Sequence, residues 1–319
     1  AVSCYDARTG TLVWMHTDRA RFWEANAGAG PRATPTLARG RVFSFGATGI
    51  LNALDASDGA RLWSRDLAAE ARVETPYWGF SGSPLVIDGV VFAAAAGTLA
   101  AFEAGSGERR WMSAAGGVSH SSPQRLTIDG VEQIVLLSKT GATSFAPADG
   151  RVLWQHEWAG FPIVQPSVTA DGDLLISVSE STGLRRLAVR RTGDAWSLKE
   201  RWTSIRLKPY FSDFVVHEGY AYGFDGGILA ALDLATGERA WKGGRYHHGQ
   251  ILLVEDLLLV LTEEGELVMV EATPEEHREL GRFQAIDGHT WNNFALFGDL
   301  LLVRNGQEAA GWRLPLARP

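Results

Sequence analysis

One motif of eleven residues recurs along the chain and constrains the fold more than any other feature. Its clearest copy is Ala53-x-Asp55-x-x-Asp58-Gly59-x-x-x-Trp63, a turn pair followed four residues later by tryptophan. The tryptophans are spaced by 39 to 49 residues, which is the period of propeller blades. Further copies end at Gly10 and Trp14, Gly107 and Trp111, Gly150 and Trp154, and Gly237 and Trp241, with a looser one at Gly193 and Trp202.

Each repeat reads as four short strands joined by turns. In residues 85–95, an apolar run, the pair Asp88-Gly89 and a second apolar run predict a hairpin, because Asp-Gly suits a type I′ turn. The Thr-Gly or Asp-Gly pair of the motif closes the outer hairpin, and its tryptophan covers apolar surface where neighbouring blades pack. Pairs in the place of Asp88-Gly89 are Asp129-Gly130, Asp171-Gly172, Glu218-Gly219 and Gly298-Asp299.

The predicted fold is therefore all-β, a β-propeller of four-stranded antiparallel blades forming a single domain over residues 1–319. Residues 1–16 supply only the outer two strands of a first, incomplete blade, and 291–316 supply three strands of a last one. Both segments contain a third strand, which favours eight blades in the parent molecule. The alternative is seven blades, closed by the two ends together. Complete blades are expected at 33–66, 82–113, 121–157, 165–203, 211–243 and 249–284.

The repeated A-x-D-x-x-T-G-x-x-x-W motif, with Asp-Gly hairpins between its copies, resembles the PQQ-like propeller repeat. That family includes quinoprotein alcohol dehydrogenases, which use pyrroloquinoline quinone (PQQ). It also includes the propeller lipoprotein of the outer-membrane β-barrel assembly machine and many bacterial periplasmic proteins. The resemblance covers nearly the whole chain and is specific for the fold. It implies a periplasmic or secreted bacterial protein, whose leader is absent from this chain.

Composition narrows the classes of partner. The formal charge of −7 argues against a nucleic-acid partner, which needs a basic face. Cys4 is the only cysteine, so no disulfide can form within the chain. No stretch approaches the ~18 to 20 apolar residues of a membrane span. We expect a monomer with no membrane span in this chain.

Loops that precede the innermost strand of each blade carry aromatic, histidine and amide side chains. Architectural loops are usually rich in Gly, Pro, Ser and Asp, whereas convergent aromatics with a few polar groups suit a ligand pocket. These loops predict a site for a protein segment or small molecule on the channel face. The competing interpretation is that the aromatics fill the channel and the histidines are hydrogen-bonded in its rim. The candidates are Trp23, Glu24, Trp78, His120, Gln165, Tyr210, Asp213, His247, His248, Trp291, Asn292 and Asn293.

The resemblance also raises a dehydrogenase hypothesis. Quinoprotein dehydrogenases hold PQQ with an adjacent-cysteine disulfide above it and a tryptophan below it, with Ca²⁺ on Glu and Asn ligands and an Asp base. A single cysteine excludes the disulfide. Trp78 or Trp291 is a candidate floor, Asp213 a candidate base, and Glu24 with Asn292 or Asn293 candidate cation ligands. None of them lies in a motif specific enough to carry the role over, so no resident cofactor is expected.

A metal site is left open. His247 and His248 are adjacent, so on a strand they point to opposite faces and cannot chelate together. One of them could join His120 or His289 in a zinc site. A histidine hydrogen-bonded in the rim is the competing interpretation.

These observations favour a non-catalytic bacterial scaffold that binds a protein segment or small ligand on its loop-rich face. The alternatives are a PQQ- and Ca²⁺-dependent alcohol or sugar dehydrogenase, and a sensor or interaction module cut from a longer protein.

Overall fold

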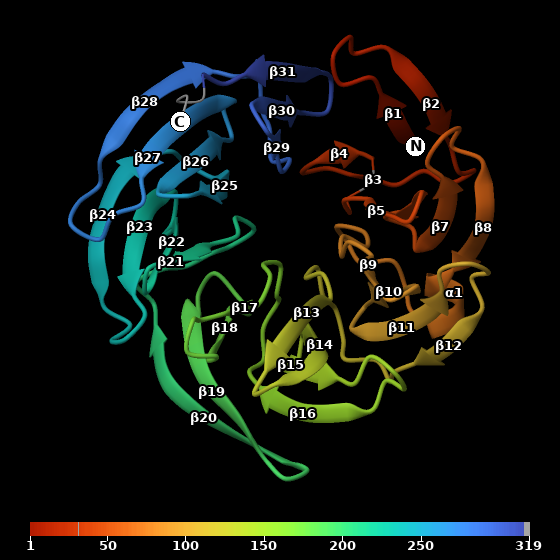
Figure 1. Cartoon of the computed structure of the whole chain (residues 1–319), viewed down its shortest axis with the longest axis horizontal. Coiled ribbons are helices and arrows are strands. Elements are labelled where there is room, and N and C mark those ends of the chain that lie inside the picture. Colours follow the sequence, from red (N-terminus) through yellow and green to blue (C-terminus); the bar gives the residue numbers. More distant parts are fainter. Residues whose placement is uncertain (31, 316–319) are drawn as a thin grey trace. The chain divides into compact units, whose positions relative to one another are not determined.

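A computed structural model describes residues 1–30 and 32–315, so Leu316, the predicted end of the last blade, lies outside the described residues. Contacts within the chain divide it into two compact units. The first unit comprises Ala1–Val168, Gly172–Val178 and Ala188–Lys199. The second unit comprises Thr169–Asp171, Ser179–Leu187 and Glu200–Pro319. The colours of Figure 1 follow the chain through both.

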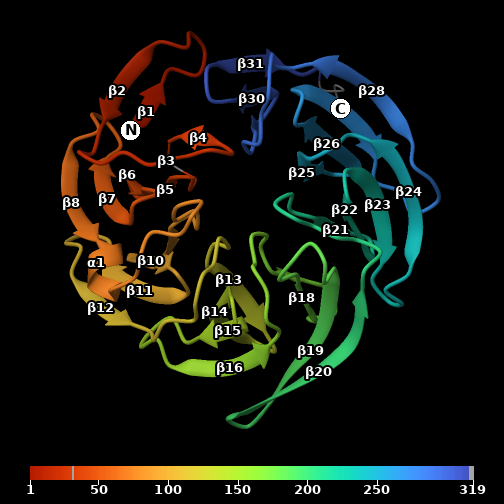
Figure 2. The ribbon, with the colours of Figure 1, turned by 180° about the vertical axis from the view of Figure 1, so that it is seen from behind.

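Six sheets have four antiparallel strands each, and in every one the strands lie side by side in chain order (Figures 1 and 2). They match the six predicted complete blades closely. Their strands are β5 (Thr36–Ala38), β6 (Arg41–Phe45), β7 (Ile50–Asp55) and β8 (Arg61–Asp66); β9 (Leu85–Ile87), β10 (Val90–Ala95), β11 (Thr98–Glu103) and β12 (Arg109–Met112); β13 (Gln124–Ile128), β14 (Val131–Ser138), β15 (Gly141–Phe145) and β16 (Val152–Glu157); β17 (Ser167–Val168), β18 (Leu174–Ile176), β19 (Leu184–Thr192) and β20 (Ala195–Ser204); β21 (Val215–His217), β22 (Tyr220–Phe224), β23 (Ile228–Asp233) and β24 (Arg239–Arg245); β25 (Gly249–Val254), β26 (Leu257–Thr262), β27 (Glu266–Glu271) and β28 (Glu279–Gln284).

The remaining described elements are three smaller sheets and one short helix. β29 (Ala295–Phe297), β30 (Leu300–Arg304) and β31 (Ala309–Arg313) form a three-stranded sheet. β1 (Val2–Tyr5) pairs with β2 (Leu12–His16), and β3 (Trp23–Glu24) with β4 (Gly28–Ala29). The helix α1 spans Leu67–Ala71, and no described helix is long and apolar enough to cross a membrane.

The chain is thus an all-β propeller of antiparallel blades, as predicted. Six sheets of four strands and one of three fit the seven-bladed alternative. The sheet β1–β2 contains the two strands expected of the incomplete first blade. The preference for eight blades concerned a longer parent molecule and stays a prediction.

The hairpin prediction is confirmed at all five turn pairs, because the strands on either side of each pair are antiparallel partners, and in three of them both turn residues adopt positive φ. Asp88 and Gly89 have φ of 46° and 82°, and Asp129-Gly130 and Glu218-Gly219 repeat this geometry. Positive φ at both central residues gives the type I′ twist that matches antiparallel strands. In the other two pairs the glycine alone, Gly172 or Gly298, has positive φ.

The motif tryptophans reach from one sheet to the next along the chain. Their indole N–H groups donate to a main-chain carbonyl that follows the third strand of that next sheet. For Trp14, Trp63, Trp111 and Trp202 the motif glycine of the next sheet lies under the indole ring: at Gly107, with φ +73°, a Cβ atom would lie 2.7 Å from the Trp63 ring. The bonds are Trp14 to Ala56 (3.0 Å), Trp63 to Ala104 (3.0 Å), Trp111 to Pro147 (3.1 Å), Trp202 to Leu234 (2.9 Å) and Trp241 to Thr273 (2.7 Å).

Trp154 differs from these tryptophans. Its indole N–H donates to Gln133 Oε1 at 2.6 Å, and both residues belong to the sheet β13–β16. Gln133 is fully buried and also accepts from Ser144 Oγ. At Trp154 the acceptor is therefore a buried side-chain amide of the same blade, instead of a main-chain carbonyl of the next blade.

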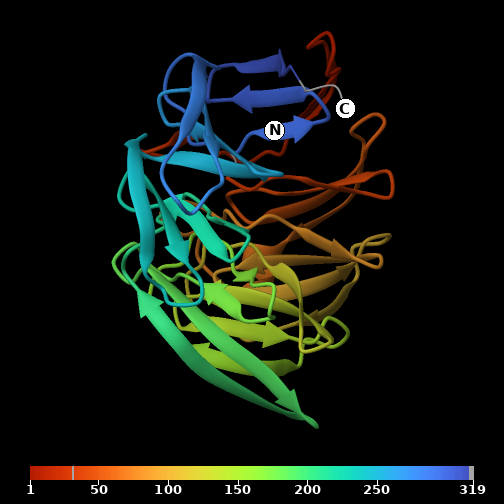
Figure 3. The ribbon, with the colours of Figure 1, turned by 60° about the vertical axis from the view of Figure 1, so that its left-hand side comes forward.

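Neighbouring sheets pack face to face through apolar side chains of their middle strands. In the first unit, Phe43 and Phe45 of β6 share one core with Val91 of β10 and Phe102 of β11. Figure 3 shows the sheets β5–β8, β9–β12 and β13–β16 stacked in succession. In the second unit, Tyr222 and Leu229 pack with Leu258 and Val268 in the same way. Apolar burial between blades is the main favourable term for such a fold.

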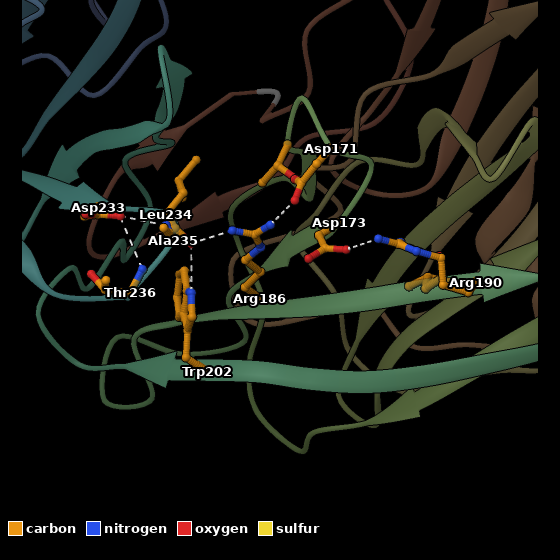
Figure 4. A network of polar contacts seen from close by, with 11 residues as sticks. Asp171, Asp173, Arg186, Arg190, Trp202, Asp233, Leu234, Ala235 and Thr236 are labelled. Atoms are coloured by element: carbon orange, nitrogen blue, oxygen red, sulfur yellow. Dashed lines mark hydrogen bonds and ion pairs between the residues drawn. The ribbon is translucent and has the colours of Figure 1, made fainter.

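Around Trp202, ion pairs supplement this packing. The Leu234 carbonyl that accepts from Trp202 also accepts from Arg186 Nη1 at 2.6 Å, and Arg186 Nη2 pairs with Asp171 (Figure 4). The side chain of Asp233 accepts from the N–H groups of Ala235 and Thr236 in the turn that holds this carbonyl. Trp202 and Arg186 therefore hold this turn at its Leu234 carbonyl, and Asp233 holds it at its N–H groups.

Candidate functional site

Four successive loops of the first unit are joined by a ladder of hydrogen bonds just before their innermost strands. The Thr34 N–H donates to Ser83 Oγ (3.0 Å), the Ser83 N–H to Ser122 Oγ (2.9 Å), and the Ser122 N–H to Gln165 Oε1 (2.7 Å). Each of these four residues precedes a proline, which favours the extended backbone needed to enter a strand. The ladder brings these four loops together.

Gln165 therefore has a structural role at the end of this ladder. Its Oε1 also accepts from Ser121 Oγ at 3.1 Å and lies 3.3 Å from Gln124 Nε2. Sequence reasoning placed Gln165 in the loops correctly but missed the ladder. The recurring residue-proline pair before each innermost strand was the signal that could have revealed it.

A first aromatic cluster, Tyr77, Trp78, His120 and Phe161, lies beside the ladder. The Trp78 ring is 5.4 Å from Phe161 and 5.5 Å from His120, and the Tyr77 ring is 6.3 Å from Trp78. Trp78 and His120 were predicted site residues, whereas Phe161 was not. Phe161 joins the cluster because the fold places its ring against those of Trp78 and His120. Tyr77 is 67% exposed and Phe161 is 40% exposed, so the outer part of the cluster faces solvent.

His120 forms the buried base of this cluster. Its Nδ1 lies 2.9 Å from Ser81 Oγ, and its main-chain N–H donates to the Pro162 carbonyl. Burial lowers the pKa of His120 to about 4, so the ring is neutral at physiological pH. Among the described residues its Nε2 has no hydrogen-bond partner. His120 is therefore a neutral, buried side chain packed between the Trp78 and Phe161 rings, and we assign it a structural role in these loops.

Trp23 and Glu24 lie in the short sheet β3–β4 of the same unit. Trp23 is 63% exposed, and the ring of its neighbour Phe22 approaches Gly79 next to Trp78. Glu24 is buried, and its carboxylate accepts from Arg32 Nη2 (2.7 Å) and from the N–H groups of Asn26 and Ala27. Burial would raise the pKa of Glu24, but these hydrogen bonds outweigh it and lower the pKa.

A second aromatic cluster, Tyr210, Phe211, His248, His289 and Trp291, lies in the second unit. The Phe211 ring contacts His248 at 4.9 Å, Trp291 at 5.5 Å and Tyr210 at 5.2 Å, measured between ring centroids. The rings of His289 and Trp291 are 4.5 Å apart. The structure thus brings together three of the predicted residues, Tyr210, His248 and Trp291.

Glu263 anchors the second aromatic cluster and was not predicted. Its Oε2 accepts from the Trp291 indole N–H at 2.9 Å and lies 3.8 Å from His289 Nε2. Its backbone N–H donates to the His248 carbonyl at 2.7 Å. Glu263 follows the strand β26 in a Glu-Glu-Gly turn, and nothing in that local pattern distinguishes it from a solvated turn residue.

The other predicted residues lie on the same loops without joining a ring cluster. His247 is exposed and has φ of 57°, whereas Asp213 is half-buried. The Asn292 N–H donates to Thr290 Oγ1, and Asn293 is exposed.

These residues do not fit PQQ with Ca²⁺. The Arg32 guanidinium already pairs with the Glu24 carboxylate, where a cation ligand would be needed. Trp78 meets Phe161 edge to face, and Trp291 meets Phe211 and His289 in the same way, so neither indole is a free flat floor. Within the described ranges, no group of three or more His, Cys, Asp or Glu side chains could hold a metal ion.

Comparison with known proteins identifies a family. The family described as outer membrane protein assembly factor BamB matches residues 1–242. The BamB protein of Moranella endobia (strain PCIT) is 25% identical over an alignment of 253 residues, and the match covers 75% of this chain. The match covers 64% of that relative's length.

Solved structures show the same fold. BamB from Moraxella catarrhalis superposes with a TM-score of 0.69 at 17% identity, over 97% of this chain and 87% of that one. A quinohemoprotein alcohol dehydrogenase from Comamonas testosteroni gives a TM-score of 0.61 at 14% identity, over 89% of this chain and 64% of that one. Identities this low show only that the fold is shared. The likeness to the dehydrogenase therefore gives no information about the activity of this chain.

Proposed function

The chain belongs to the family of the outer membrane protein assembly factor BamB, and from this premise we propose that it is a non-catalytic scaffold. It binds segments of other proteins during outer membrane protein assembly, in the periplasm of a bacterium. The assembly role is taken from the name of the relatives. The match covers only 64% of the length of the relative from Moranella endobia, so this role is part of the proposal. The binding role is argued from the loops themselves.

Three exposed aromatic side chains on the loops of the first unit, Trp23, Tyr77 and Phe161, are the observation that carries this proposal. We call these three residues the aromatic rim. Tyr77, Phe161 and Trp23 are 67%, 40% and 63% exposed, although aromatic side chains are usually buried. Exposed aromatics on a rigid frame supply large contact area at low entropic cost, which is why they dominate protein-binding surfaces. The polar groups beneath them, Glu24 and Gln165, are already hydrogen-bonded within the protein.

An extended, apolar protein segment is the ligand that suits this rim best. Aromatic rings bind apolar side chains without requiring a fixed hydrogen-bond pattern, so segments of different sequence can be accepted. A catalytic site would instead need free acid, base or nucleophile groups held toward a substrate. The buried, neutral His120 and the ion-paired Glu24 do not offer them.

Titration with an unfolded outer membrane β-barrel protein tests the proposal. The double substitution Tyr77→Ser with Phe161→Ser is expected to raise the Kd at least tenfold, because each aromatic contact contributes about 1 kcal/mol or more. The matched control is Leu62→Ser with Val152→Ser, which changes two exposed apolar residues, each 45% exposed, on the outer strands β8 and β16. The control is expected to bind like the wild type.

Two outcomes would contradict the proposal. One is an equal loss of affinity in the double variant and in the control, which would place binding outside the aromatic rim. The other is the absence of any binding by the wild-type protein. Reduction of an artificial electron acceptor after addition of PQQ, Ca²⁺ and an alcohol would favour the dehydrogenase alternative instead.

A further inference from the structure

Three cationic side chains of the second unit converge on one buried carboxylate. Asp225 follows β22, and its Oδ2 lies 2.6 Å from both Arg239 Nη2 and Lys242 Nζ. Lys208 Nζ is 3.6 Å from its Oδ1. The Asp225 side chain is 5% exposed, whereas the three cations are 27% to 37% exposed. The carboxylate therefore lies beneath the cations, whose outer sides face solvent.

This basic cluster, Lys208, Arg239 and Lys242 around Asp225, has more positive charge than its own carboxylate neutralises. Three cations and one carboxylate leave a local charge of +2. The neighbouring Arg206 is paired with Glu238 at 2.8 Å and does not change this balance. The chain as a whole is acidic, with a formal charge of −7, and has only four lysines. Two of those four are in the basic cluster.

The cluster also holds hydrogen-bond donors that Asp225 does not use. A lysine ammonium has three donors and an arginine guanidinium five. Lys242 donates one bond to Asp225, and Arg239 uses Nε and Nη2 for Asp225 and the Arg206 carbonyl. Among the described residues, Arg239 Nη1 and the Lys208 ammonium make no hydrogen bond. Arg239 is held in place by its bonds to the Arg206 carbonyl, so its free edge is preorganised.

We propose that the basic cluster binds a phosphate group. A phosphate monoester has a charge of about −1.5 to −2 at neutral pH, which matches the local excess of +2. A carboxylate of charge −1 would neutralise only half of it. The three terminal oxygens of the phosphate can accept from Lys208, Arg239 and Lys242 together, and charge-assisted bonds of this kind are strong. Asp225 keeps the cations close together until the phosphate arrives.

This proposal goes beyond the binding of protein segments and does not depend on it. The same chemistry is presented by free inorganic phosphate and by the headgroup of a phosphomonoester lipid. Isothermal titration calorimetry with inorganic phosphate at low salt tests the first source. Cosedimentation with phosphatidylcholine vesicles that contain phosphatidic acid tests the second, with pure phosphatidylcholine vesicles as the blank.

The four lysines provide a matched pair of variants. Lys208→Gln with Lys242→Gln removes two cations from the cluster and is expected to weaken phosphate binding at least tenfold. Lys139→Gln with Lys199→Gln makes the same change of charge at the two exposed lysines elsewhere and is expected to bind like the wild type. Because Asp225 loses two of its three cationic partners in the first variant, Lys208→Gln alone is also measured. That variant retains both 2.6 Å contacts of Asp225 and is expected to weaken binding severalfold.

Binding of free phosphate that is lost only in the cluster variants supports the proposal. Binding to phosphatidic acid vesicles alone, with the same dependence on Lys208 and Lys242, supports it with a lipid as the source. Binding of neither probe by the wild type overturns the proposal. Equal losses in the cluster variant and in the Lys139 and Lys199 control also overturn it, since they would show a response to net charge only.

Discussion

Acidification is expected to destabilise the first unit through His120, the one histidine that is buried in the described part of the chain. Its pKa is about 4 in the folded protein and 6.5 in an unfolded chain. The unfolded chain therefore binds the proton more tightly, and stability falls as the pH drops from 6.5 toward 4. A shift of this size corresponds to about 3 kcal/mol in full, of which about 2 kcal/mol is lost between pH 7.5 and pH 5.

Urea unfolding followed by tryptophan fluorescence at several pH values measures this loss. His120→Asn keeps a side-chain group near Ser81 but removes the titration. The free energy of unfolding of the wild type relative to this variant is expected to fall by about 2 kcal/mol between pH 7.5 and pH 5. His247→Asn is the matched control, because His247 is exposed and its φ of 57° is tolerated by asparagine.

Parallel pH profiles for the wild type and His120→Asn would refute this reasoning. They would mean that the ring is protonated as readily in the folded protein as in the unfolded chain. A slope that changes equally in His247→Asn would refute it as well, since it would assign the effect to histidine content.

Other predictions concern the contacts between blades and the loop ladder. Trp111→Ala should lower the free energy of unfolding by ~3 to 5 kcal/mol, because it removes a large side chain between sheets, and an unchanged melting temperature would contradict this role. Gly150→Ala should cost more than Gly193→Ala: both have positive φ, but a Cβ at Gly150 would lie 2.5 Å from the Trp111 ring, whereas Gly193 has open space. Equal melting temperatures for these two variants would show that the ring contact has no energetic weight. Ser122→Ala should cost about 1 to 3 kcal/mol, because it leaves the Ser83 N–H without its acceptor, and chemical unfolding measures the difference.

Much of the fold could be predicted from the sequence because its determinants are local and repeated. The hairpin at Asp88-Gly89 depends on the backbone preferences of two adjacent residues. The sheet borders follow from the same motif read six times, so a weak copy such as Gly193 with Trp202 is placed by its neighbours. The different partner of Trp154 was not predictable, since it depends on a buried amide, Gln133, in a strand that otherwise reads as apolar.

The candidate site was predicted less completely because its contacts join residues distant in sequence. The loops were singled out by their aromatic composition, and their role in binding stays a prediction. The ladder through Ser83 and Ser122 requires successive loops to be in register, and Glu263 is recognisable only from its bond to Trp291. The basic cluster escaped notice for the same reason, since Lys208 and Lys242 meet only when Asp225 lies between them.

Site-specific photocrosslinking tests the central claim most directly. A photoreactive phenylalanine derivative is placed at position 77, in the exposed aromatic rim, and in a second protein at position 62, on the outer strand β8. After mixing with an unfolded outer membrane β-barrel protein, position 77 is expected to give a covalent adduct and position 62 none. Adducts of equal yield from both positions, or an adduct from position 62 alone, would contradict the assignment of the rim as the binding surface.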